Sequence, residues 1–307
     1  MTAFYVLSGF ALFYTWQFRN LQDVSIIKKF YQKRLIGIIP LYYVVAILYI
    51  ILMGKETIFQ NLLLAPVELL GIQSIFNSLF DISHNGGTWF ISCLLVCYIL
   101  YPFIQEITKQ LRVKAKIIII FFLIGILLYS PFIVYWFKTS TIYSNPFFRL
   151  LEFIIGVLIC SLLPNISFNR IGKLLYSWQM VFLEYIMLIV GVSLGVKFNI
   201  SLGNYMLYSW VALPMFVLLI ISMFGVKFPY YIRNSKALIY FSKVSYAFFL
   251  GQFFAWKSTI YIVDIIGFDT NSTRIIISFL LCIIYAMILH ELVEKFFIKV
   301  LYEKIYN

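Results

Sequence analysis

The chain has 307 residues, of which 63% are hydrophobic and only 12% are charged, and its mean hydropathy is +0.96. This composition supplies too little polar surface to enclose a core of this size in water, so it excludes a soluble globular protein. The net charge of +12 comes from short Lys and Arg clusters between apolar runs. Membrane topology explains such clusters, and they do not indicate a nucleic-acid partner.

Nine apolar runs predict membrane-spanning helices, because a helix needs about 20 residues to cross roughly 30 Å of hydrocarbon. The residue alternation of a membrane β-barrel is missing. The predicted fold is therefore all-α, a polytopic transmembrane helical bundle with about nine spans, forming a single domain over residues 1–307. In chain order the runs are Thr2–Phe18, Leu35–Met53, Thr88–Glu106, Ile117–Phe137, Phe148–Leu163, Trp178–Gly195, Tyr205–Val226, Val244–Asp264 and Thr273–Val293.

The Lys and Arg residues test this layout, because short cytoplasmic loops retain positive charge. With nine crossings, eighteen of the 24 fall in alternate connections and the tail, which places the carboxyl terminus in the cytoplasm. A shorter run, Phe59–Ile72, is expected to be interfacial or re-entrant, because a crossing there would invert every later loop. The eighteen are Arg19, Lys28, Lys29, Lys33, Arg34, Lys109, Arg112, Lys114, Lys116, Arg170, Lys173, Lys227, Arg233, Lys236, Lys243, Lys295, Lys299 and Lys304.

The same count puts the amino end outside the cell with only Met1 before the first run. An outward amino end normally follows a translocated tail or an earlier helix. We therefore expect one helix, running from inside to outside, to be missing from this chain. The full unit would then have ten spans.

Few ionisable residues lie at membrane depth, where such residues are functional candidates. Arg149 and Glu152 share a helix face; an ion pair that locks the bundle is the preferred interpretation, and a substrate site is the alternative. His84, in the polar segment Phe76–Gly87, and His290 are candidates for a general base, and a capping or interfacial role is the alternative for each. The four cysteines lie inside apolar runs, and no metal site is predicted.

The basic stretch before the second run has two interpretations. Lys33 and Arg34 stand where the chain would enter the membrane, so positive-inside topology explains them. They would also suit the phosphate groups of a nucleotide-containing donor.

Several motifs in register with this topology resemble the acyltransferase 3 family of integral membrane acyltransferases. Together they extend over nearly the whole chain. They are Phe4-Tyr5-Val6-Leu7-Ser8-Gly9-Phe10, Lys33-Arg34-Leu35-Ile36-Gly37-Ile38-Ile39-Pro40, Gly87-Thr88-Trp89-Phe90-Ile91-Ser92, Phe148-Arg149-Leu150-Leu151-Glu152 up to Gly156, Val244-Ser245-Tyr246, and Glu294-Lys295-Phe296.

The resemblance implies O-acylation of a cell-envelope or lipid-linked polysaccharide in the cell membrane. The acyl group, expected to be acetyl, would come from cytoplasmic acyl-CoA, a co-substrate and not a bound cofactor. Arg34 and Lys33 would contact the coenzyme. The residues implied to line or shape the substrate cavity are Ser8, Trp89, Arg149, Glu152, Ser245, Tyr246 and Gln252. Partners would be membrane lipid and the glycan acceptor, with the oligomeric state open.

Three departures from the family pattern keep alternatives open. The family's first span, with an Arg and the His regarded as catalytic, is absent here; Gly37 replaces a second Arg, and Gln252 stands where many members have a His. Glutamine forms hydrogen bonds but cannot act as a base. The alternatives are a transporter of polysaccharide or lipid-linked sugar, and a catalytically inactive remnant.

Overall fold

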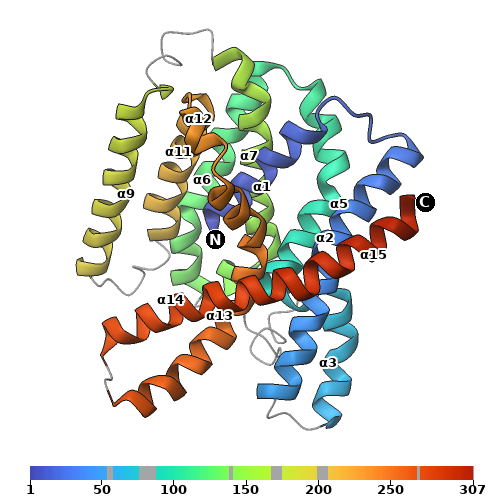
Figure 1. The fold of residues 1–307 in the computed structure, drawn as a ribbon. Coiled ribbons are helices and arrows are strands. Elements are labelled where there is room, and N and C mark those ends of the chain that lie inside the picture. Colours follow the sequence, from blue (N-terminus) through green and yellow to red (C-terminus); the bar gives the residue numbers. More distant parts are fainter. Residues whose placement is uncertain are drawn as a thin grey trace. The chain divides into compact units, whose positions relative to one another are not determined.

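The computed structural model describes residues 1–53, 58–75, 88–137, 141–166, 175–198, 207–267 and 270–306. Every regular element in these ranges is a helix (Figure 1). In chain order they are α1 (Thr2–Trp16), α2 (Val24–Met53), α3 (Ile58–Leu70), η1 (Gln73–Ile75), α5 (Trp89–Gln110), α6 (Val113–Phe137), η2 (Thr141–Ser144), α7 (Pro146–Ile166), α9 (Trp178–Phe198), η3 (Leu207–Ala212), α11 (Leu213–Gly225), α12 (Tyr230–Arg233), α13 (Lys236–Ile266), α14 (Asn271–Ile288), η4 (Leu289–Glu294) and α15 (Lys295–Tyr306).

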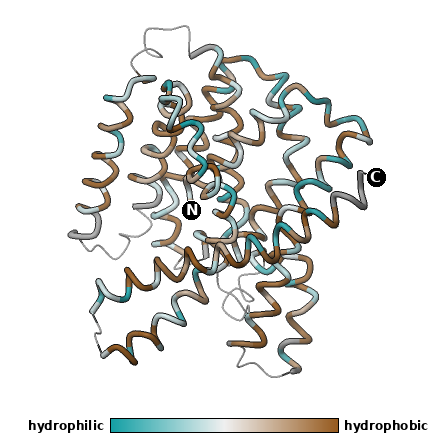
Figure 2. Tube along the Cα trace, in the orientation of Figure 1, coloured by the Kyte–Doolittle hydropathy of each residue, from teal (hydrophilic) through white to brown (hydrophobic). Residues whose placement is uncertain are grey.

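Each of the nine predicted runs coincides with a helix, so the all-helical membrane fold is confirmed. Six helices in the described ranges are long and apolar enough to cross a membrane. The other three runs correspond to α1, α9 and the η3–α11 segment, which are shorter; their crossing stays a prediction. Hydrophobic residues predominate along α9 and α14 (Figure 2).

Two helices begin well before the apolar runs that predicted them. Helix α2 starts at Val24 and not at Leu35, so the basic stretch belongs to its first turns instead of a loop. Lys and Arg are good helix formers, and the Asp23 carboxylate caps this end by accepting hydrogen bonds from the backbone N–H of Ser25 (2.7 Å) and Ile26 (3.4 Å). Helix α13 likewise starts at Lys236, before the predicted Val244.

The run predicted at Phe59–Ile72 forms α3, a helix of 13 residues. At 1.5 Å per residue it reaches only about 20 Å, which is less than a full crossing. Gly71 ends it with a φ of 64°, a left-handed conformation that favours glycine. This length fits the interfacial or re-entrant prediction.

The chain contacts define two compact units that are interleaved in sequence. The first comprises 1–28 and 93–227, and the second 29–92 and 228–307. The chain passes from one to the other within α2, within α5 and between α11 and α12. A single domain over residues 1–307 stays a prediction.

In the first unit, α1 and α7 lie side by side and cross with their backbones in contact (Figure 1). A Cβ added at Gly9 would lie 2.0 Å from the Phe153 carbonyl oxygen, and one at Gly156 would lie 1.9 Å from that of Val6. Small residues allow this approach, which is the usual basis of helix packing in membranes. The glycines of two family-like motifs are thus explained by packing.

A series of hydrogen bonds joins α5 to α1 in the same unit. Tyr101 donates to the carbonyl of Leu12 at 3.2 Å, and one turn later Gln105 donates to that of Trp16 at 2.6 Å. After another turn Lys109 reaches the carbonyl of Arg19 at 3.0 Å. The four-residue spacing on α5 keeps these donors on one face, so they fix the register of the two helices.

In the second unit, α13 and α14 form a helical hairpin (Figure 1). Gly267, with a φ of 73°, ends α13, and the Thr270 side chain caps α14 by accepting a hydrogen bond from the Thr273 N–H at 3.1 Å. These two local signals turn the chain back on itself.

Helix α13 runs parallel to α2 in this unit. The Tyr246 hydroxyl donates to the Ile38 carbonyl at 3.0 Å, and farther along both helices the Tyr49 ring lies 5.1 Å from that of Phe253. The residues before Tyr246 and those before Ile38 therefore lie toward the same end of the pair.

Candidate functional site

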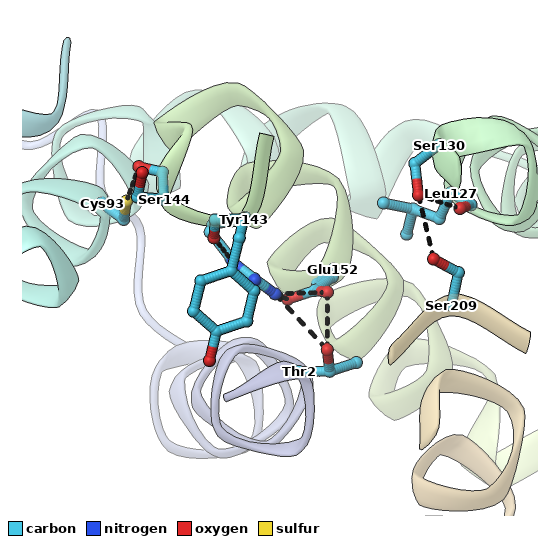
Figure 3. Close-up of polar contacts among 9 residues, drawn as sticks. Thr2, Cys93, Leu127, Ser130, Tyr143, Ser144, Glu152 and Ser209 are labelled. Atoms are coloured by element: carbon cyan, nitrogen blue, oxygen red, sulfur yellow. Dashed lines mark hydrogen bonds and ion pairs between the residues drawn. The ribbon is translucent and has the colours of Figure 1, made fainter. Parts of the chain in front are cut away.

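An ion pair on α7 forms a well-connected polar group in the described part of the first unit. Arg149 Nη1 donates to both carboxylate oxygens of Glu152, at 2.7 and 2.8 Å (Figure 3). Thr2 of α1 donates its hydroxyl to Glu152 at 2.9 Å. Because Arg149 and Glu152 are 4% and 5% exposed, the pair is shielded from solvent. The pairing expected from the three-residue spacing is present.

Two tyrosines hold the guanidinium in place. Arg149 Nε donates to the Tyr143 carbonyl at 2.7 Å, and the guanidinium carbon lies 4.5 Å from the Tyr143 ring centroid. The ring of Tyr5, on α1, lies 5.6 Å away. A cation over aromatic faces is stabilised by their quadrupoles, and more strongly when water is excluded. The pair therefore joins α7, α1 and the short η2 helix.

Local sequence positions Arg149 in the second turn of α7. Asn145 accepts a hydrogen bond from the Phe147 N–H at 2.9 Å, and Pro146 suits the first helical position. On the preceding η2 helix, the Ser144 carbonyl accepts a hydrogen bond from the Cys93 thiol at 3.2 Å (Figure 3). This bond ties η2 to α5.

A small cavity of about 30 Å³ adjoins the ion pair, with Ser130 and Ser209 hydrogen-bonded to each other at 2.9 Å in its wall (Figure 3). That volume holds roughly one water molecule and is far too small for a sugar ring. The geometry thus supports the structural interpretation of Arg149 and Glu152. The lining residues are Leu127, Ser130, Ile142, Tyr143, Phe148, Arg149, Glu152, Ser209 and Leu213.

Three residues around the ion pair could not be predicted from the sequence: Thr2, Tyr5 and Tyr143. Thr2 and Tyr5 are three residues apart and face α7 from α1, but contacts so distant in sequence give no local signal. Ser8, predicted to line a cavity, is half-buried on α1, one residue before the glycine of the α1–α7 crossing. Its role in a site stays a prediction.

Lys33 and Arg34, the predicted coenzyme contacts, belong to the second unit. Both are half-buried on α2, whereas Lys28 and Lys29 one turn earlier are exposed. The Arg34 guanidinium carbon lies 5.9 Å from the ring centroid of Phe30. This part of α2 therefore presents partly shielded cations, the kind that bind phosphate more strongly than fully hydrated ones.

The predicted Ser-Tyr element lies on α13 in the second unit. Tyr246 reaches the Ile38 carbonyl, one turn beyond Arg34, so the structure brings this element to the basic helix. Ser245 is exposed and donates to the carbonyl of Ser242 at 2.8 Å, and Gln252 is exposed on the same helix.

Trp89 begins α5 and is 6% exposed. Its carbonyl accepts a hydrogen bond from the Ser74 hydroxyl at 2.9 Å, and Ser92 donates to the carbonyl of Gly71 at 2.5 Å. The neighbouring Phe90 ring lies 4.7 Å from that of Phe249 on α13. The Trp-containing element is thus fixed against both η1 and α13.

Of the two histidines, His84 lies outside the described residues. His290 is buried on η4, a π-helical turn, and its Nδ1 lies 2.7 Å from a carboxylate oxygen of Glu294. Glu294 begins the Glu-Lys-Phe motif of the sequence. A carboxylate behind an imidazole fixes the ring and its tautomer.

A larger groove of about 400 Å³ lies in the first unit at the end of α1 that is remote from Thr2. The Tyr176 ring packs directly on Gly225, where any side chain would displace it. Burial raises the pKa of Tyr176. The mainly apolar lining suits a hydrocarbon chain better than a sugar; it comprises Tyr14, Gln17, Cys160, Leu163, Pro164, Tyr176, Phe224 and Gly225.

Comparison with protein-family profiles gives one decisive finding. The profile described as "Acyltransferase domain" (Acyl_transf_3) matches residues 1–291. Searches of curated proteins and of solved structures each gave no significant match.

Proposed function

Because this chain belongs to the acyltransferase 3 family, we propose that it transfers an acyl group, acetyl foremost, from acyl-CoA to a hydroxyl of a cell-envelope or lipid-linked polysaccharide. Family membership and the apolar helices make it a multi-pass membrane acyltransferase. The match over residues 1–291 is the observation that carries the proposal. The identities of the donor, the acyl group and the acceptor are themselves part of the proposal.

On the donor side, Lys33 and Arg34 would bind the coenzyme phosphates. Their partial burial on α2 supports this role, since shielding strengthens charge-assisted hydrogen bonds. Alternate connections hold most of the basic residues, which supports a cell-membrane protein with a cytoplasmic carboxyl terminus and donor entry from that side. A reporter enzyme fused after residue 307 tests this orientation: activity only of a cytoplasm-dependent reporter supports it.

On the acceptor side, a base must take the hydroxyl proton as the oxygen attacks the thioester carbonyl, and the thiolate of coenzyme A leaves. Trp89, Ser245 and Tyr246 are proposed to shape the space for these groups. In support, Tyr246 of α13 contacts α2, and Phe90, next to Trp89, packs on Phe249 of α13. Gln252, on the same helix as Ser245 and Tyr246, is proposed as a further contact, whereas Ser8 belongs to the first unit and stays a separate prediction. Exposed Gln252 would contribute hydrogen bonds only.

Replacing Arg34 with glutamine is expected to raise the KM for acyl-CoA roughly tenfold or more, because a charged hydrogen bond contributes about 1.5–3 kcal/mol. The turnover number should change little. Lys29→Gln is the matched control, since it removes an exposed cation one turn away on the same helix. Equal effects of both variants on KM would show that general positive charge, and not Arg34, attracts the donor.

Deletion of the gene tests the function as a whole. The proposal predicts envelope polymer in normal amount but with fewer acyl esters, and restoration by the gene. Loss of the polymer itself would indicate a transporter instead. No change in either quantity would indicate an inactive remnant.

A further inference from the structure

A buried histidine–carboxylate pair lies on η4, apart from the residues discussed for donor and acceptor. His290 is 5% exposed, and Glu294 accepts or shares the proton on its Nδ1 at 2.7 Å. Its other ring nitrogen, Nε2, is buried and makes no hydrogen bond within the described part of the chain. A buried polar atom of this kind costs free energy unless a ligand or water meets it.

Glu294 contacts His290, whereas the neighbouring Glu291 has other partners. Glu291, on the same turn, accepts hydrogen bonds from Lys295 Nζ at 2.6 and 2.7 Å and from the Tyr240 hydroxyl at 3.0 Å. Because Lys295 compensates the charge of Glu291, Glu294 is the carboxylate that orients the imidazole. When Nδ1 carries the proton, Nε2 presents a lone pair, which is the arrangement of a general base.

Partly exposed side chains lie close to the buried histidine. The side chains of Lys295 and Glu291 are 53% and 41% exposed, and the Tyr240 ring lies edge-on to the imidazole at 6.0 Å. The π-helical turn that carries the dyad is itself a feature enriched at functional sites.

This dyad and the basic part of α2 lie toward the same end of the second unit. Tyr240 precedes Tyr246 on α13 as Arg34 precedes Ile38 on α2, and the two helices run parallel. Each offset of four to six residues corresponds to about 6–9 Å. The proposed coenzyme contacts and the imidazole are therefore at comparable levels along the helices.

We propose that His290 is a general base of the acyl transfer, with Glu294 as its positioning residue; this rests on the proposed function. Nε2 takes the proton of the acceptor hydroxyl while the hydroxyl oxygen forms a bond to the thioester carbonyl carbon. The C–S bond then breaks, and the imidazolium returns the proton to the coenzyme A thiolate. The products are an ester and free coenzyme A.

The test compares His290→Ala, Glu294→Gln and the control Glu291→Gln in membranes supplied with labelled acetyl-CoA and envelope glycan. We expect His290→Ala to lower kcat by about 10²- to 10⁴-fold at an unchanged KM, because proton transfer is lost. Glu294→Gln should lower it by a smaller factor, and Glu291→Gln should leave it near wild type. Added imidazole should restore His290→Ala, whereas pyrrole, which has the same shape without a basic nitrogen, should not.

Wild-type kcat in His290→Ala, or equal restoration by imidazole and pyrrole, would overturn the role of the base. If His290→Ala does not accumulate, His290→Gln replaces it, since an amide keeps hydrogen bonding but cannot act as a base; full activity of that variant would also overturn the proposal. A wild-type protein that transfers no acetyl group would instead refute the proposed function itself.

Discussion

Arg149→Met is expected to lower the free energy of unfolding by about 3–5 kcal/mol, because it leaves the Glu152 carboxylate buried without its cation. Glu152→Met should cost a similar amount. The double variant should recover much of the loss, since two apolar side chains of similar volume need no partner. Thermal unfolding in detergent, followed through all three variants, measures the coupling.

Lys295→Met is the control for this series. Its partner Glu291 lies on an exposed turn, and exposed ion pairs contribute about 0–1 kcal/mol. Strictly additive losses at Arg149 and Glu152 would contradict the structural lock. A stable double variant that retains activity would show that neither side chain handles substrate, as the 30 Å³ cavity indicates.

Gly156→Val is expected to separate α1 from α7 and to cost about 1–3 kcal/mol or more. The added Cβ would lie 1.9 Å from the carbonyl oxygen of Val6, which is backbone and has no rotamer to change. The yield of folded protein and its unfolding temperature in detergent report the effect.

Gly125→Ala on α6 is the matched control, because no atom outside the local helix lies within 4 Å of the Cβ it would add. Its expected effect is neutral or stabilising by up to about 1 kcal/mol, from higher helix propensity. Equal destabilisation at Gly125 and Gly156 would argue against the backbone crossing.

The helices could be predicted because lipid admits few alternatives: a long apolar run must satisfy its own backbone hydrogen bonds. The first residues of α2 and α13 were harder to predict. Both helices begin outside the lipid with residues that include Lys, and the apolar run that marks the helix in the sequence begins only later. The division into two compact units had no counterpart in composition, because it depends on which helices pack together.

In the candidate site too, contacts that depend on tertiary packing could not be predicted from the sequence. The Arg149–Glu152 pair followed from a three-residue spacing, whereas Thr2 and Tyr143 reach it through tertiary packing. Gly9 and Gly156 were visible as parts of motifs, but only the crossing explains them. A lone histidine in a sequence is weak evidence for catalysis, whereas the structure shows that Glu294 contacts His290.

Transfer of label from radiolabelled acetyl-CoA to envelope glycan tests the central claim most directly. Membranes containing the full-length protein should incorporate acetyl groups that mild alkali releases, as expected for esters, and Arg34→Gln should require more donor for the same rate. Incorporation no greater than in membranes from a deletion strain would contradict the account.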